Sequence, residues 1–259
     1  MTHPLTLWFD PPVGEIVLAR PERRNALNVE MWEAIPALVD AANSDARVKV
    51  ILLHGGGGGV FAAGADISEF GVVYGTEDAA RRSGRIIAAA LNALEESAKP
   101  VIAAIEGPCV GGGVSLAAAC DLRVAHAGAT FGVTPAKLGL VYPPGDMRRL
   151  LQLIGPGASK DLLLTGRLIP AAEAKAMGLV DRLTDEPVLE AARALAMEIA
   201  GVSQWSARAI KQMIRGLQTG WREDGPEAEA LFLEGFANPD FSEGVSAFLE
   251  KRRADWKVS

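Results

Sequence analysis

Short apolar runs alternate with amphipathic segments through most of the chain. Residues 48–55 (VKVILLHG) and 100–107 (PVIAAIEG) are nearly continuous apolar runs that end in glycine, and they predict buried strands. Residues 25–45 and 76–98 repeat their apolar positions with a helical period. Strands that alternate with helices predict an α/β fold with crossover connections.

The two ends of the chain follow other patterns. Residues 5–20 contain two apolar runs around the turn sequence DPPVG, which predicts a hairpin. After about residue 200 only helical periodicity remains, over 204–218, 227–237 and 242–256. We therefore expect a core over residues 1–200 and a helical region over 201–259. The Trp and Phe content of that region suggests that it packs on something, such as another subunit.

Two helix starts can be placed from local signals. Asn25 or Asn28 is suited to cap the helix over 25–45, because an Asn side chain accepts a hydrogen bond from the first turn. Pro143 and Pro144 suit the first turn of a later helix, where the missing proline N–H has no partner to lose.

Composition narrows the possible classes of function. The 259 residues carry a formal net charge of −6, and a basic stripe for nucleic acid is not expected. The first residues lack a basic and apolar secretion signal, and no window reaches the ~20 apolar residues of a membrane span. The two cysteines, Cys109 and Cys120, are eleven residues apart without a nearby histidine, so no metal site is predicted. We expect a cytoplasmic protein that binds neither membrane nor nucleic acid.

Two glycine-containing segments share one design. Residues 61–70 (FAAGADISEF) and 111–115 (GGGVS) each pass from a strand through small residues into a helix start. N–H groups in the first turn of a helix have no internal acceptor, and two that converge on one oxygen form an oxyanion hole. The alternative is that these glycines only permit tight turns and close packing. The presence of two such segments in one chain favours the oxyanion hole over the packing interpretation.

Several motifs together resemble the crotonase (enoyl-CoA hydratase/isomerase) superfamily. The similarity runs almost from end to end. The motifs that carry it are RPERRNALN (20–28), AAGADI (62–67), KPVIAAIEGPCVGGGVSLAAACDLRVA (99–125), TFGVTPAKLGL (130–140), LLTGRLIPAAEAKAMGLVDRL (163–183) and FSEGVSAFLEKR (241–252). The resemblance implies an α/β spiral of ββα units, with C-terminal helices that support a homotrimer or a dimer of trimers.

The resemblance also implies a site for an acyl-CoA thioester. The backbone N–H groups that stabilise the thioester enolate would belong to Ala65 and Gly112. Coenzyme A would enter as part of the substrate, so no separate cofactor is expected. The residues implied in binding it are Arg23, Arg24, Ala62, Ala63, Gly64, Asp66, Ile67 and Lys251.

The sequence departs from the family pattern where similar hydratases carry two glutamates. The first position is Ser115, and the second falls on Pro135, or on Ala136 if the prolines are matched. None of these side chains takes up a proton at neutral pH. Loss of one positioned acid or base typically costs ~10²–10⁴-fold in rate, so ordinary hydration is doubtful.

Tyr142 and Asp146 are the polar residues that could replace the glutamates. Tyr142 resembles a tyrosine of methylmalonyl-CoA decarboxylase, and decarboxylation of a malonyl-type thioester needs a proton donor but no base. Packing with a satisfied hydroxyl is the other interpretation of Tyr142. Asp146 could serve in catalysis, cap the helix, or pair with Arg148 or Arg149. A different class remains open, namely a non-catalytic acyl-CoA-binding protein.

Overall fold

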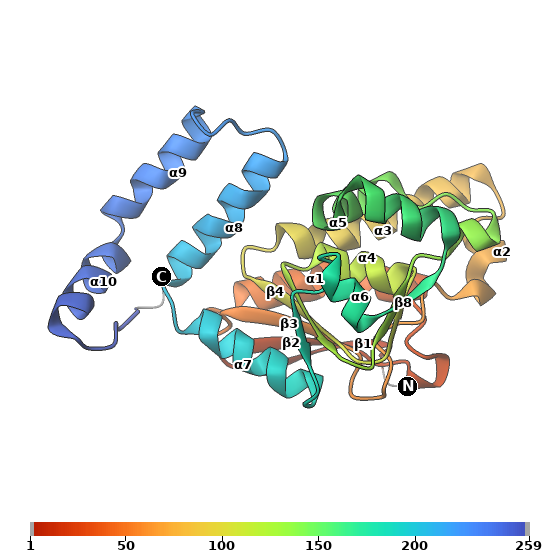
Figure 1. The fold of residues 1–259 in the computed structure, drawn as a ribbon, viewed down its shortest axis with the longest axis horizontal. Coiled ribbons are helices and arrows are strands. Elements are labelled where there is room, and N and C mark those ends of the chain that lie inside the picture. Colours follow the sequence, from red (N-terminus) through yellow and green to blue (C-terminus); the bar gives the residue numbers. More distant parts are fainter. Residues whose placement is uncertain (1–2, 257–259) are drawn as a thin grey trace.

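The computed structural model describes residues 3–256 as an α/β core that carries a helical extension (Figure 1). Its main sheet has six strands in the order β1-β2-β3-β4-β6-β9. The first pair, β1 and β2, is antiparallel, and the remaining neighbours are parallel. The strands are β1 (Leu5–Asp10), β2 (Val13–Leu18), β3 (Val50–His54), β4 (Val101–Ile105), β6 (Leu122–His126) and β9 (Arg182–Thr184). The predicted hairpin, buried strands and α/β class are confirmed.

Helices cover both faces of this sheet. On one face, α7 (Val188–Ala200) places Ala192, Leu195 and Ala196 on side chains from the central strands. On the other face lie α1 (Val29–Ser44) and α3 (Glu77–Glu96), which pack against each other and against the sheet (Figure 1). All five residues of β3 and of β4 are buried, which explains their continuous apolar sequence.

A second, three-stranded sheet stands beside the first and leads into the glycine loop. Its order is β5-β7-β8, with β5 (Pro108–Val110) parallel to β7 (Thr130–Gly132) and β7 antiparallel to β8 (Leu168–Pro170). Directly after β5 comes α4 (Gly112–Ala119), an almost fully buried helix. The remaining helices of the core are α2 (Phe70–Val73), α5 (Pro144–Thr165) and α6 (Ala171–Ala176).

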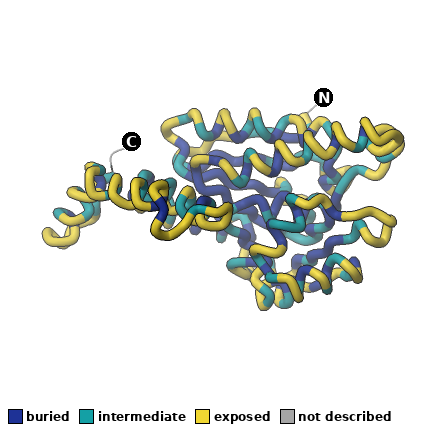
Figure 2. The backbone as a smooth tube through the Cα atoms, turned by 90° about the horizontal axis from the view of Figure 1, so that it is seen from above, coloured by how far each residue is buried: buried dark blue, intermediate teal, exposed yellow. Residues whose placement is uncertain are grey.

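The last three helices form an extension on one side of the core. They are α8 (Gln204–Gln218), α9 (Pro226–Ala237) and α10 (Pro239–Glu250). Figure 2 shows this extension largely exposed, whereas the interior of the core beside it is buried. The expected change near residue 200 falls between the end of α7 and the start of α8, although the division into two domains stays a prediction.

The predicted helix ends agree with the structure in part. Asn28, not Asn25, caps α1 by accepting a hydrogen bond from the Met31 N–H at 3.0 Å. The helix expected over 242–256 is wrong at both ends, because α10 starts at Pro239 and ends where Lys251 turns left-handed (φ 54°). Residues 61–62 form a single bridge, Ala62 with Cys109, instead of the expected strand. Within residues 3–256, no helix combines the length and apolar character needed to cross a membrane.

Candidate functional site

The two small-residue segments lie side by side in the fold. The N–H of Val110 donates to the carbonyl oxygen of Ala62 at 3.0 Å, next to the bridge between Ala62 and Cys109. A Cβ added to Gly111 would stand 3.8 Å from the Cα of Gly64. The start of α4 and the segment that contains Ala65 therefore meet, as the shared pattern predicts.

The N–H groups of Ala65 and Gly112 have no acceptor within residues 3–256. Neighbouring N–H groups are already bonded: that of Gly111 donates to the carbonyl of Gly132 at 2.8 Å. After Ala65, the N–H of Asp66 donates to Leu27 at 2.9 Å. Gly112 is the first residue of α4, where an N–H lacks a partner within the helix. Two unpaired donors are thus available in the joined loops.

Close packing also requires the glycines at this junction. Gly111 has φ 52° and Gly64 has φ 111°, which residues with a Cβ rarely adopt. A Cβ on Gly113 would stand only 2.7 Å from the carbonyl oxygen of Ala62. The packing interpretation of the glycines therefore holds as well, and it is what brings the two loops together.

The arginine-rich segment docks against the same loop. The N–H of Ala63 donates to the carbonyl of Arg24 at 3.0 Å, and Arg20 forms an ion pair with Asp66 at 3.0 Å. Arg23 and Arg24 are exposed on this side, as contact with a phosphate would need. Asp66 starts the short helix that begins at Ile67 by accepting from the Ser68 N–H, and the hydrogen bond from Ser68 lowers the pKa of its carboxyl.

Lys251 is not brought to these residues within one chain. It follows α10 in the helical extension, at the opposite end of the molecule from α2 (Figure 1). The remaining predicted binding residues, Ala62 to Ile67, form one continuous segment, with Ala62 and Gly64 buried and Ile67 exposed.

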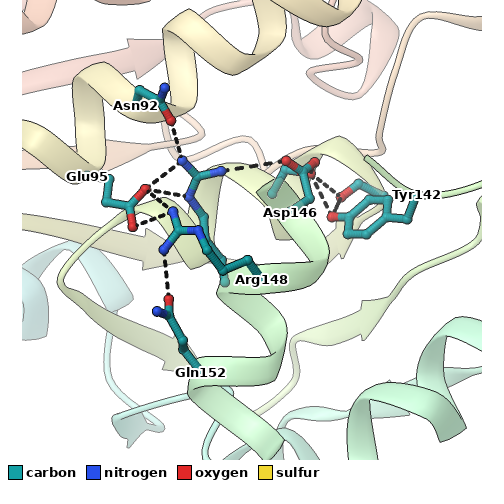
Figure 3. Close-up of polar contacts among 9 residues, drawn as sticks. Asn92, Glu95, Tyr142, Asp146, Arg148 and Gln152 are labelled. Carbon is teal, nitrogen blue, oxygen red and sulfur yellow. Dashed lines mark hydrogen bonds and ion pairs between the residues drawn. The ribbon is translucent and has the colours of Figure 1, made fainter. Parts of the chain in front are cut away.

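Ser115, Tyr142 and Asp146 form a buried polar cluster behind the glycine loop (Figure 3). The Oγ of Ser115 lies 2.6 Å from the hydroxyl of Tyr142 and 2.6 Å from Oδ2 of Asp146. The Tyr142 hydroxyl also lies 3.2 Å from the carbonyl oxygen of Gly111. That carbonyl belongs to the same peptide group as the N–H of Gly112, so the cluster contacts the far side of a candidate oxyanion donor.

A second layer of charges holds Asp146. Arg149, whose side chain is 3% exposed, lies 3.7 Å from Oδ1 of Asp146 and donates to Glu95 and Asn92 (Figure 3). Glu95 also pairs with Arg148, which is more exposed. Burial raises the pKa of Asp146, while the Ser115 hydrogen bond and Arg149 oppose that rise. Burial and the nearby Asp146 raise the pKa of Tyr142 well above its usual value.

The segment of the expected second glutamate carries no acid. Pro135 and Ala136 begin a short 3-10 helix that ends at Leu138, and Gly139 follows in a left-handed conformation. The residues after it, Leu140 and Val141, are exposed, and the chain then turns inward at Tyr142.

Sequence reasoning identified the three cluster members but not their contact. It offered Arg148 or Arg149 as a partner of Asp146, and the structure has the pair with Arg149, three residues further along α5. The hydrogen bond between Ser115 and Asp146 joins residues 31 positions apart, and the role of Glu95 was missed. The only signal for Glu95 was its place on the polar face of a predicted helix.

The chain is similar to known proteins over nearly its whole length. The enoyl-CoA hydratase/isomerase family model matches residues 10–259. A crotonyl-CoA hydratase from Syntrophomonas wolfei is 37% identical over 244 residues, 93% of each chain. A solved structure from Hyphomonas neptunium, assigned to the enoyl-CoA hydratase/isomerase family, is 64% identical with a TM-score of 0.97, covering 99% of this chain and 98% of that one. An enoyl-CoA hydratase structure from Bacillus anthracis is 32% identical with a TM-score of 0.92, over 99% and 100% of the two chains.

Proposed function

Because the chain belongs to the enoyl-CoA hydratase/isomerase family, we propose that it processes acyl-CoA thioesters through an enolate held by two main-chain N–H groups. The observation that carries this proposal is the pair of unbonded N–H groups at Ala65 and Gly112. Hydrogen-bond donors fixed around a developing oxyanion stabilise it without reorganising during the reaction. The thioester oxygen would lie between the two N–H groups.

Binding of coenzyme A would use the segment next to this hole. Arg23 and Arg24 are exposed beside Ala63, to which Arg24 is hydrogen-bonded. Guanidinium groups recognise phosphates through paired hydrogen bonds. Residues 62–67 would then face the adenine, and Lys251 could take part only from a neighbouring subunit.

Ordinary hydration is expected to be slow in this protein. A hydratase that uses two carboxylates needs one to activate water and one to protonate carbon, whereas Ser115 and Pro135 stand at those positions here. Within residues 3–256, Asp146 is the carboxylate of the cluster. Its hydrogen bond within the cluster is the one that it accepts from Ser115. The site therefore favours reactions with one proton transfer at carbon.

Decarboxylation of a malonyl-type thioester is the second candidate. In that reaction the bond to the carboxylate breaks, carbon dioxide leaves, and the released electron pair forms the enolate. A proton must then be added at the α-carbon. The Tyr142 hydroxyl, held beside Ser115 and Gly111, is the observation that favours this reaction.

The experiment that tests the oxyanion hole compares Gly112→Pro with Gly112→Ala. Both variants add a Cβ about where Leu27 and Trp32 approach to 3.2 Å, but only proline removes the N–H. Proline is tolerated at the first position of a helix. We expect Gly112→Pro to lower turnover about 10²–10³-fold relative to Gly112→Ala. Equal turnover of the two variants would overturn the proposed hole.

The substrates for this comparison are crotonyl-CoA and malonyl-CoA, with binding measured in parallel by calorimetry. Turnover of either identifies the reaction class. Tight binding without turnover over a broader thioester panel would instead support a non-catalytic acyl-CoA-binding protein.

The helical extension is proposed to join subunits of a homotrimer or of a dimer of trimers. The helices α8, α9 and α10 border an apolar groove of about 710 Å³. Its lining includes Trp205, Phe232, Phe236, Phe241, Phe248 and Trp256. Most of these rings are exposed in a single chain, and burial against another copy would remove them from water. Light scattering on the purified protein would give the subunit number, and a monomer would contradict this assignment.

A further inference from the structure

The Ser115 cluster can hold its hydrogen bonds in two opposite directions. With an ionised Asp146, the Tyr142 hydroxyl donates to Ser115, and the Ser115 hydroxyl donates to Asp146 at 2.6 Å. With a protonated Asp146, both bonds reverse, and the Tyr142 hydroxyl donates to the carbonyl of Gly111 at 3.2 Å. Each arrangement satisfies every hydroxyl without movement of a side chain.

We propose that this cluster is a proton relay, in which Asp146 supplies and takes up the proton that Tyr142 exchanges with the α-carbon of the substrate. This inference rests on the proposed enolate chemistry. Tyr142 would be the catalytic residue, and Ser115 and Asp146 would act through it.

The relay conserves protons and charge at each step. Tyr142 gives its proton to the carbanionic α-carbon, while Ser115 gives its proton to the Tyr142 oxygen. Asp146 gives its proton to the Ser115 oxygen and becomes a carboxylate. The product of these transfers is the ionised arrangement already described, and the reverse sequence removes an α-proton from a substrate.

The Tyr142 hydroxyl is suitably placed to act where a glutamate is absent. A glutamate oxygen lies two covalent bonds further from the main chain than the oxygen of serine. The Tyr142 oxygen lies 2.6 Å from Ser115 Oγ, so the hydrogen-bonded pair extends further from the main chain of residue 115 than serine alone does. Both contact the Gly111 carbonyl, which belongs to the same peptide group as the Gly112 N–H.

The other end of the relay opens to solvent. Asp146 lines a cavity of about 800 Å³ between α3, the start of α5 and the end of α8. Water in this cavity would exchange protons with the Asp146 carboxyl. Protons would therefore reach the relay from this cavity through Asp146.

The groups around Asp146 act on its proton affinity in opposite directions. Ser115 faces it from α4, Arg149 from α5, and Glu95 and Asn92 stand behind Arg149 on α3. Because Arg149 is already bonded to Glu95, its charge is shared between two carboxylates. Burial then raises the pKa of Asp146 above that of an exposed aspartate, toward the range useful for acid–base work.

The test uses exchange of the α-protons of butyryl-CoA with deuterium in heavy water, followed by NMR. Exchange needs an enolate and a base but no particular overall reaction. We expect wild-type exchange to rise with pH through the titration of Asp146. Ser115→Ala should slow exchange about 10²-fold or more at unchanged thioester affinity, and Ser115→Thr, which keeps a hydroxyl, should restore much of it.

Asp146→Asn provides the readout that a structural role would not change. The variant can keep its hydrogen bond to Ser115 but cannot titrate, so exchange should be slow and independent of pH. If Ser115→Ala and Asp146→Asn kept the wild-type rate and pH profile while Gly112→Pro lost exchange, the relay would be wrong and the oxyanion hole would stand. If wild-type protein bound butyryl-CoA without any exchange, the relay would be wrong, and the Gly112→Pro comparison on crotonyl-CoA and malonyl-CoA would decide on the oxyanion hole.

Discussion

Arg149 and Glu95 form a double hydrogen bond from α5 to α3, with distances of 2.6 and 3.0 Å between guanidinium nitrogens and carboxylate oxygen. The Arg149 side chain is buried, and it also lies 3.7 Å from Asp146. Removing one member of a buried ion pair leaves the other charge without compensation. This contact therefore links the stability of the core to the candidate proton relay.

We expect Arg149→Ala to lower the free energy of unfolding by about 3–5 kcal/mol. The matched control is Arg148→Ala on the same helix, which removes the more exposed arginine from the same carboxylate and should cost about 1 kcal/mol or less. Urea unfolding at one protein concentration measures both. Equal losses for the two variants would show that burial of Arg149 does not decide the outcome.

Asp146→Asn is expected to stabilise the protein at neutral pH. The folded state holds the Asp146 proton at pH values where the unfolded chain has lost it, because burial raises the pKa of this carboxyl. The contribution of Asp146 to the free energy of unfolding is therefore greatest below the ordinary aspartate pKa of about 4. It decreases as the pH rises toward the higher pKa of Asp146 in the folded protein. Asparagine does not titrate and so avoids that loss. In the variant, Arg149 still has its hydrogen bonds to Glu95 and Asn92.

Thermal unfolding of both proteins at pH 4 and pH 7.5 checks this prediction. The advantage of Asp146→Asn should grow between the two pH values. An advantage that shrank with rising pH would mean that Arg149 and Ser115 stabilise the carboxylate more than burial destabilises it.

Asn25 is expected to be costly to replace, because it holds three main-chain groups. Its amide nitrogen donates to Gly55 and Val60 at 3.1 and 2.9 Å, and its oxygen accepts from the Arg20 N–H at 2.9 Å. It also has φ 53°, which disfavours most residues. Asn25→Ala should cost about 3 kcal/mol from the lost hydrogen bonds and the backbone strain together.

Two further variants separate these contributions to Asn25. Asn25→Gly relieves the backbone strain and should recover about 1 kcal/mol relative to alanine. Asn25→Asp keeps the acceptor but loses both donors. If all three variants unfolded at the same urea concentration as the wild type, neither the donors nor the backbone conformation would matter.

Both cysteines should resist thiol reagents in the folded protein. Burial raises the pKa of Cys120 from 9.0 to about 12 and raises that of Cys109 well above its usual value. At pH 8 the reactive thiolate of Cys120 is therefore about a thousandfold scarcer than in an exposed cysteine. Labelling with Ellman's reagent should show two thiols only after denaturation, and rapid labelling of the native protein would contradict this.

The sequence predicted those parts of the fold that follow from local periodicity. The buried strands β3 and β4, the hairpin and the Asn28 cap all depend on apolar runs and helix-start signals within a few residues. The end of α10 could not be predicted in this way. Trp256 continues the apolar pattern past Glu250, yet it packs beside Gly244 and donates to the Gly201 carbonyl from non-helical chain.

In the candidate site, too, local features could be predicted and contacts between distant residues could not. The small-residue patterns predict unpaired N–H groups in the two segments, and the family resemblance assigns them to Ala65 and Gly112. The contact of Ser115 with Asp146 depends on how α4 lies against α5, which no local pattern records. Asn25 illustrates the same limit, since its left-handed conformation is imposed by docking against residues 55 and 60.

The two candidate oxyanion donors are main-chain atoms, and this affects how such a site can change during evolution. No substitution except proline removes an N–H, so a substitution that spares the glycines of the two loops leaves the anchor for the thioester oxygen in place. Side chains at positions 115, 142 and 146, by contrast, can be exchanged one at a time. A lineage could in this way lose one reaction and acquire another while still binding the same class of substrate.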